Sequence, residues 1–168
     1  MKRIFLLLTL FVGALSIWAS ESIAQQNKTW IGTASTDWFD ANNWNPAGVP
    51  TAGDTVMITT NTANLPANTT VAGLILSGGF LGGSGNLTVT AKLIWTGGTM
   101  SGPGATSIPR QGVMNISGDG IKNLSQRSIS NAGTVTWTGA GSINSGNGGI
   151  ISNQANGTFE VQSNATFS

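Results

Sequence analysis

The sequence predicts an all-β fold, a parallel β-helix (β-solenoid) with an N-terminal Trp-rich cap that follows a helical signal peptide. From Val56 onward, apolar-x-apolar triplets such as Val56-Met57-Ile58 alternate with Gly, Asn and Ser turns, which is the pattern of short half-buried strands. No stretch has sustained helical periodicity, and Gly recurs too often for a long helix. Short motifs also recur at long intervals, which sandwiches and barrels have no reason to do.

The recurring motifs give the length of one coil. Trp95-Thr96-Gly97 returns as Trp137-Thr138-Gly139, and Thr134 is echoed by Thr158. These spacings of 42 and 24 residues indicate a coil of about 21–24 residues, enough for two or three short strands and their corners. We therefore expect residues 56–168 to form about five coils, stacked into a rod of roughly 25 Å at ~4.8 Å a coil.

Residues 1–24 are typical of a secretory signal peptide. Lys2 and Arg3 precede an apolar run from residue 4 to residue 18, and Ser22-Ile23-Ala24 offers small residues for cleavage. The alternative is an uncleaved membrane anchor, but the run is shorter than the ~20 residues that a membrane-spanning helix needs. The sequence predicts export, cleavage and no membrane insertion afterwards, hence an extracellular or cell-surface protein.

Composition excludes several classes of function for residues 25–168. Gly, Ser, Thr and Asn make up 73 of these 144 residues, and five basic residues balance five acidic ones. Without clustered Lys and Arg, a nucleic-acid partner or an anionic membrane surface is disfavoured. The chain has no His, Cys or Tyr, which excludes a His-activated nucleophile, a disulfide scaffold and a His/Cys zinc site. Uncharged outer ladders of Thr, Ser and Asn also suit stacked coils, because stacked like charges repel.

The segment 25–55 holds a cluster of aromatic residues, Trp30, Trp38, Phe39 and Trp44. We interpret it as a cap, because the first coil of a solenoid otherwise exposes its core and unpaired strand edges. The alternative is a carbohydrate-binding module in which Trp30, Trp38 and Trp44 stack against sugar rings.

Acidic residues allow two further hypotheses. Asp37, Asp40 and Asp54 could supply oxygen ligands to Ca²⁺, although their spacing is that of no standard calcium loop and Asp is also a common turn residue. No other cofactor is expected. Asp119 and Glu160, with Arg127 or Lys122, could belong to a fragment of a polysaccharide-acting β-helix enzyme. Their separation of about two coils disfavours acid–base chemistry, and the sequence predicts no enzyme and no catalytic residue.

The sequence stops in mid-pattern at Asn164-Ala165-Thr166-Phe167-Ser168. We expect the solenoid to be incomplete there, as the N-terminal portion of a longer surface protein. The alternative is that the uncapped last coil associates end to end with a partner or another copy.

Two sets of motifs carry a family resemblance. The segment Trp30…Asp37-Trp38…Asn42-Asn43-Trp44…Gly48-Val49-Pro50 and the repeat Trp95-Thr96-Gly97-Gly98-Thr99-Met100-Ser101-Gly102 resemble bacterial exported β-helix proteins, the autotransporter-like and haemagglutinin-like passenger regions. The resemblance implies a parallel β-helix at the cell surface and brings no catalytic residues. We therefore expect a non-catalytic, adhesin-like structural module whose partners are surface glycans or other cell-surface proteins.

Overall fold

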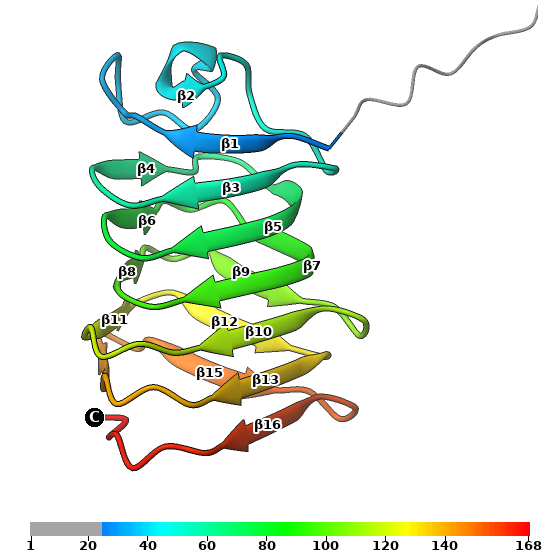
Figure 1. The fold of residues 1–168 in the computed structure, drawn as a ribbon, viewed down its shortest axis with the longest axis vertical. Helices are drawn as coiled ribbons and strands as arrows, with labels where there is room; N and C mark the ends of the chain where they lie inside the picture. The colour runs from blue at the N-terminus through cyan, green and yellow to red at the C-terminus, as the bar shows by residue number, and fades with distance from the viewer. Residues whose placement is uncertain (1–24) are drawn as a thin grey trace, which may run out of the picture.

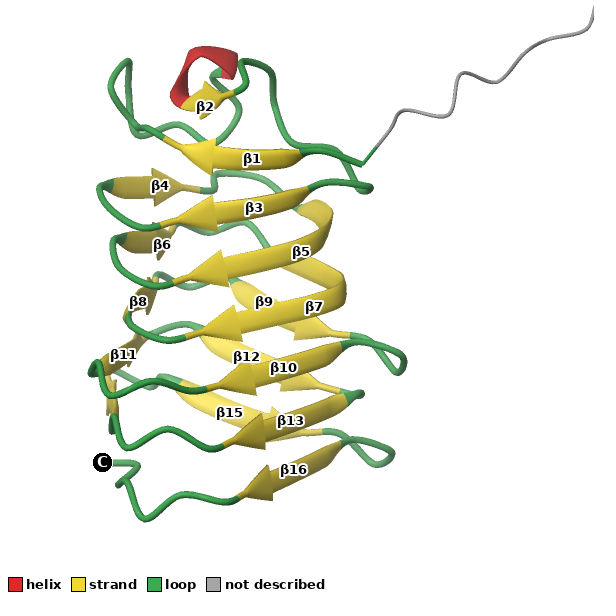
Figure 2. Ribbon diagram, in the orientation of Figure 1, coloured by secondary structure: helices red, strands yellow, loops and turns green. Residues whose placement is uncertain are grey.

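A computed structural model describes residues 25–168, which wind into a β-solenoid of about five turns (Figure 1). The predicted signal peptide lies outside the described residues. Among those residues the only helix is the short 3-10 turn η1 (Ala41–Asn43), so the predicted all-β class is confirmed (Figure 2). No helix in this part of the chain is both long and apolar enough to cross a membrane.

Seven strands stack to form the front sheet, the row of parallel arrows that runs down Figure 1. Its pairings are parallel from β1 to β16, and short β2 lies antiparallel on the outer side of β1. The strands are β1 (Asn27–Trp30), β3 (Thr55–Ile58), β5 (Thr69–Leu76), β7 (Leu87–Trp95), β10 (Val113–Ile116), β13 (Thr134–Trp137) and β16 (Thr158–Val161), with β2 at Trp44–Asn45.

Two more faces complete each coil. The second face is a separate parallel sheet of β4 (Thr62–Asn64), β6 (Phe80–Gly82), β8 (Gly98–Ser101), β11 (Lys122–Ser125) and β14 (Ile143–Gly146). The third face contains β9 (Ala105–Ile108), β12 (Ser128–Asn131) and β15 (Ile150–Asn153). The first halves of β5 and β7 also belong to it, because these two long strands bend from the third face into the front sheet.

The pairing register confirms the repeats. Trp95 pairs with Ile116, which pairs with Trp137, so the two Trp-Thr-Gly motifs lie two coils apart in one column. Thr134 pairs with Thr158, its counterpart in the next coil. Because equivalent residues of successive coils lie directly over one another, the same environment recurs and selects the same residue types.

The early coils are shorter than predicted. Thr55 pairs with Gly73 and Gly73 pairs with Lys92, so each of these front-sheet coils closes in fewer residues than the sequence echoes indicate. The cause is the corner before the front sheet. There β5 and β7 run on without interruption, whereas in the next coil a turn over residues 109–112 separates β9 from β10. The predicted coil length therefore holds only for the later coils.

The triplets point inward as predicted. Two columns of side chains line the inside of the front sheet, and the first and third residues of each triplet from Val56 to Trp137 are at most 3% exposed. Val135, which the pattern places inside, is fully buried. The columns are Val56, Leu74, Leu93, Met114, Val135 and Phe159, and beside them Ile58, Leu76, Trp95, Ile116, Trp137 and Val161.

The outer side of the third face carries a column of hydroxyl groups, which matches the predicted ladders. Register places one such residue on each of five successive coils, Thr70, Thr88, Ser107, Ser130 and Ser152. Beside it, the side chain of Asn68 accepts from the backbone N–H of Asn86 at 2.8 Å. This column is therefore neutral and made of short side chains.

Candidate functional site

Trp30, Trp38 and Trp44 come together at the head of the solenoid, above the first coil. Trp44 packs edge to face on both other rings, with centroid distances of 5.0 Å to Trp30 and 4.8 Å to Trp38. Its indole Nε1 donates to the carbonyl oxygen of Trp38 at 2.8 Å. All three side chains are at most 1% exposed, so no ring face is open for a sugar to stack on. The cluster covers the apolar end of the core, the geometry expected of a cap.

Buried Asn43 holds the loop that carries these rings. Its side-chain oxygen accepts from the backbone N–H groups of Ala34 and Ser35, both at 3.0 Å. Its amide donates to Ser35 Oγ at 2.8 Å and to the carbonyl oxygen of Asp37 at 3.0 Å. The adjacent Trp44 pairs with Trp30 between β2 and β1. Burial of a fully bonded amide fixes the loop.

Asp37 and Asp40 are engaged in local turns rather than aimed at a common point. Asp37 accepts from the backbone N–H of Phe39 at 2.9 Å. Asp40 is the N-cap of η1 and accepts from the backbone N–H of Asn42 at 3.0 Å. That backbone hydrogen bond holds the pKa of Asp40 below its ordinary value.

Asp54 is almost completely buried and ties together the beginning of the solenoid. Its carboxylate accepts from the backbone N–H groups of Gln26 at 2.9 Å and Thr51 at 2.8 Å, and from the Thr51 hydroxyl at 3.0 Å. Burial alone would raise the pKa of Asp54. The hydrogen bonds from Thr51 and Gln26, with the charge of Lys28, outweigh it and leave the pKa lowered. Asp54 thus stabilises the fold by linking Gln26 to Thr51.

Among residues 25–168 no group of three or more His, Cys, Asp or Glu side chains lies close enough to hold a metal ion. Asp37, Asp40 and Asp54 therefore do not converge: the first two bond within their own turns, and Asp54 bonds to Thr51 and Gln26. In this part of the chain the structure assembles no set of carboxylate ligands for the predicted calcium ion.

The enzyme hypothesis uses Arg127 as a basic partner of Asp119 and Glu160. In the structure its side chain is fully buried inside the solenoid. Its Nε donates to Thr106 Oγ1 at 2.9 Å. Four backbone carbonyl oxygens accept from the two terminal nitrogens, those of Gly83 and Ser101 at 3.2 Å, Gly85 at 2.9 Å and Ala105 at 3.3 Å. Burial lowers the pKa of Arg127 to about 10, so the group is charged at neutral pH.

The other candidate acid–base partner, Lys122, is also buried. Its Nζ donates to the carbonyl oxygens of Gly120 at 2.8 Å and Gly118 at 3.3 Å, and burial lowers its pKa. Arg127 and Lys122 therefore bind backbone oxygens instead of facing a substrate surface. Neither is placed as the enzyme hypothesis requires.

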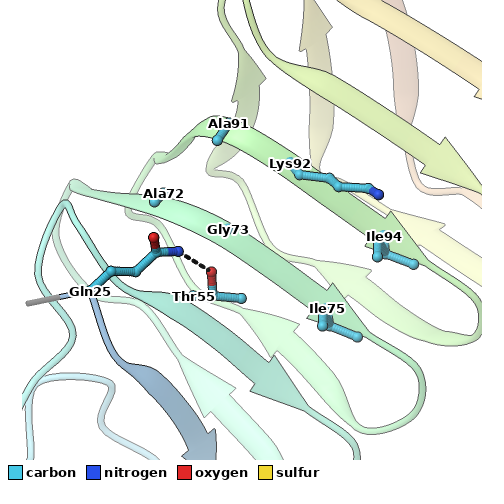
Figure 3. Close-up of a pocket in the computed structure, with 8 residues that line it drawn as sticks. All are labelled: Gln25, Thr55, Ala72, Gly73, Ile75, Ala91, Lys92 and Ile94. Atoms are coloured by element: carbon cyan, nitrogen blue, oxygen red, sulfur yellow. Dashed lines mark hydrogen bonds between the residues drawn. The ribbon is translucent and has the colours of Figure 1, made fainter.

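A shallow groove lies on the outer side of the front sheet, where β5 and β7 bend (Figure 3). Its volume is about 180 Å³, and Gln25, Thr55, Gly73, Ile75, Lys92 and Ile94 line it. Gln25 donates from Nε2 to Thr55 Oγ1 at 3.3 Å. The groove exists because residue 73 lacks a side chain: a Cβ there would lie 2.6 Å from Thr55 Oγ1. With one titratable group, Lys92, it has no paired acid and base.

No protein-family model matches the chain, and no curated protein or solved structure is significantly similar to it. The fold is accordingly assigned from its own geometry.

Proposed function

We propose that the protein is a non-catalytic, exported structural module of the adhesin-like kind, located at the cell surface or outside the cell. The observation that carries the proposal is the uninterrupted stacking of inward columns from coil to coil. Neighbouring coils share one core and continuous backbone hydrogen bonding, so the described chain behaves as one stiff unit. Such a unit suits holding surfaces at a distance better than closing around a substrate.

The composition of the outer faces supports the same function. The hydroxyl column of Thr70, Thr88, Ser107, Ser130 and Ser152 offers regularly spaced donors and acceptors without charge. We expect surface glycans or other cell-surface proteins to contact it. The resemblance to autotransporter-like and haemagglutinin-like passenger regions supports a bacterial cell-surface location.

Export and display can be tested together. The full chain with a C-terminal epitope tag is produced in a Gram-negative bacterium, and intact cells and medium are probed with antibody and with external protease. We expect tagged protein outside the cytoplasm with an N-terminus at Gln25. Retention of the full-length chain in the cytoplasm would contradict the proposal, as would turnover of a polysaccharide by the purified protein.

Contact through the third face is tested on a glycan array. Ser107→Lys replaces the middle of the hydroxyl column by a long charged side chain, and Thr136→Lys makes the same change on the outer side of the front sheet. We expect bound glycans to be lost with Ser107→Lys and kept with Thr136→Lys. The reverse result would place the contact surface on the front sheet.

A further inference from the structure

The groove on the outer side of the front sheet owes its shape to three stacked residues. Thr55, Gly73 and Lys92 follow one another in one outward column, on β3, β5 and β7. Because the middle residue has no side chain, a notch opens between a hydroxyl group and an ammonium group. At ~4.8 Å a coil, the backbones on its two sides lie roughly 10 Å apart, which leaves room for one ring-sized group. Figure 3 shows Gln25 and Lys92 on opposite sides of this notch.

The floor of the groove is apolar. Ile75 and Ile94 are neighbours in the next outward column, and Ala72 and Ala91 line the groove beside them. Both Ile side chains are half-buried, so part of each is open to a ligand. An aliphatic floor with a few polar groups at its rim is the usual composition of a small-ligand site. It suits the C–H face of a sugar ring, whose hydroxyl groups point toward the rim.

Lys92 gives the groove a positive charge. Among the described strands of the front sheet, the only acidic residue in the two outward columns is Glu160, three coils from Ile94. This separation of roughly 14 Å exceeds the ~8 Å over which exposed charges interact at physiological salt. Asp54, in the corner before β3, is buried and already bonded to backbone N–H groups. The exposed ammonium therefore suits an anionic group supplied by a ligand.

We propose that this groove binds one carboxylated sugar residue, such as a uronic acid, of an acidic glycan. The proposal rests on the proposed function and deepens it, because it names one class of surface glycan. The carboxylate pairs with Lys92, and the ring lies over Gly73 and Ile75. Hydroxyl groups of the ring bond to Thr55 and Gln25.

An acidic peptide fits this groove less well than a sugar. The strands β3, β5 and β7 each pair with a neighbour on both edges, so they offer no backbone groups to an added strand. The groove also takes one ring-sized group rather than a run of side chains.

Methyl β-glucuronoside and methyl β-glucoside test the proposal, because they differ only in carrying a carboxylate or a hydroxymethyl group. Each is titrated into the isotope-labelled protein and followed by the amide signals in NMR spectra. We expect the glucuronoside to shift the signals of residues 73–75 and 92–94. The glucoside should bind about fivefold more weakly, since it lacks the ion pair. Added salt should weaken binding of the glucuronoside alone.

Three variants separate the contributions of the charge and of the notch. Lys92→Gln removes the charge and should bind the glucuronoside as weakly as the glucoside. Gly73→Ala fills the notch, since a Cβ there would lie 2.6 Å from Thr55 Oγ1, and should weaken binding of both sugars. Arg110→Gln is the matched control, because it removes the same charge from an exposed turn that does not line the groove. It should bind both sugars as the wild type does.

A circular dichroism melting curve accompanies each variant. Lys92→Gln changes an exposed side chain and should melt as the wild type does, so the test stands even if Gly73→Ala unfolds. Equal affinity for the two sugars overturns the proposal, as does an absence of shifts at residues 73–75 and 92–94. An equal loss of affinity in Arg110→Gln also overturns it, because attraction by net charge alone would then explain the binding.

A titration with tetraglutamate covers the other class of ligand. We expect weaker binding than that of the glucuronoside, and stronger binding at the same signals would assign the groove to an acidic peptide instead. The tests of export and of the hydroxyl column change no residue of the groove. Their outcomes are therefore independent of this one, and the groove can fail while the proposed function holds.

Discussion

Replacing Arg127 by Lys tests whether the planar fork of this buried guanidinium holds the solenoid together. Arg127 has five N–H donors, and each has its own acceptor in the interior. A Lys ammonium keeps the charge but offers only three donors, so at least two of the five hydrogen bonds are lost. A hydrogen bond to a charged group contributes about 1.5–3 kcal/mol, so the loss of two should reduce the free energy of unfolding of Arg127→Lys by about 3–6 kcal/mol.

That loss is a large fraction of the roughly 5–15 kcal/mol by which a domain is stable. The measurement is urea unfolding of the purified protein, followed by circular dichroism. The matched control is Arg110→Lys, because Arg110 is exposed in the turn between β9 and β10; it should change the free energy by less than about 0.5 kcal/mol. If Arg127→Lys also stayed within about 1 kcal/mol of the wild type, the hydrogen bonds would not stabilise the fold in the way argued.

Three other predictions concern the register, the cap and pH. Val135→Asp buries a carboxylate with no partner and should abolish cooperative unfolding in a thermal melt, whereas Thr136→Asp, one residue away on the outer side, should melt nearly as the wild type does. Removal of residues 25–55 uncovers the first coil and should give oligomers by light scattering; a soluble monomer of residues 56–168 would count against the cap. The pKa of Asp54 is lower in the folded than in the unfolded chain, so its stabilisation is present above the ordinary value of 3.8 and is lost as pH falls through the folded pKa. The urea midpoint should therefore drop more steeply below about pH 4 for the wild type than for Asp54→Asn, and equal slopes would remove Asp54 from this role.

The pairing register was predictable from the sequence because parallel coils repeat the same environments. Trp95 and Trp137 lie in the same column, two coils apart. Thr134 and Thr158 lie in a second column, in adjacent coils. Any substitution in such a column is felt by the coils above and below it. The echoes between residues far apart in sequence are therefore direct consequences of stacking.

Corner lengths were not predictable in the same way. The core constrains the strands, but a corner can take extra residues outward without disturbing the columns. The coil from Gly73 to Lys92 is accordingly shorter than the coil from Thr134 to Thr158, although both stack in the same sheet. The repeated motifs lie in the longer, later coils, so the spacing between them did not predict the length of the early coils.

The burial of Arg127 was hidden from the sequence for a different reason. Its acceptors belong to residues 83–106, which precede it by more than 20 positions, and four of the five are backbone oxygens that every residue possesses. An Arg in a neutral chain suggests an exposed side chain. Gly104 lies beside the guanidinium but does not reveal it, because a Cβ there would first meet the backbone oxygen of Gly85 and only then Nη1 of Arg127 at 3.0 Å.

Arg127 also changes how the coils depend on one another. In a simple repeat protein each coil is stabilised by its immediate neighbours alone. Register places Gly85, Gly104 and Arg127 on three successive coils at one corner, since Leu87 pairs with Thr106 and Ala105 pairs with Ser128. The guanidinium therefore crosses the adjacent coil and bonds to the coil beyond it. Residues 83–127 are thus linked across next-nearest coils, and the middle of the solenoid should unfold as one block while the coils near β16, which lack such a link, open first.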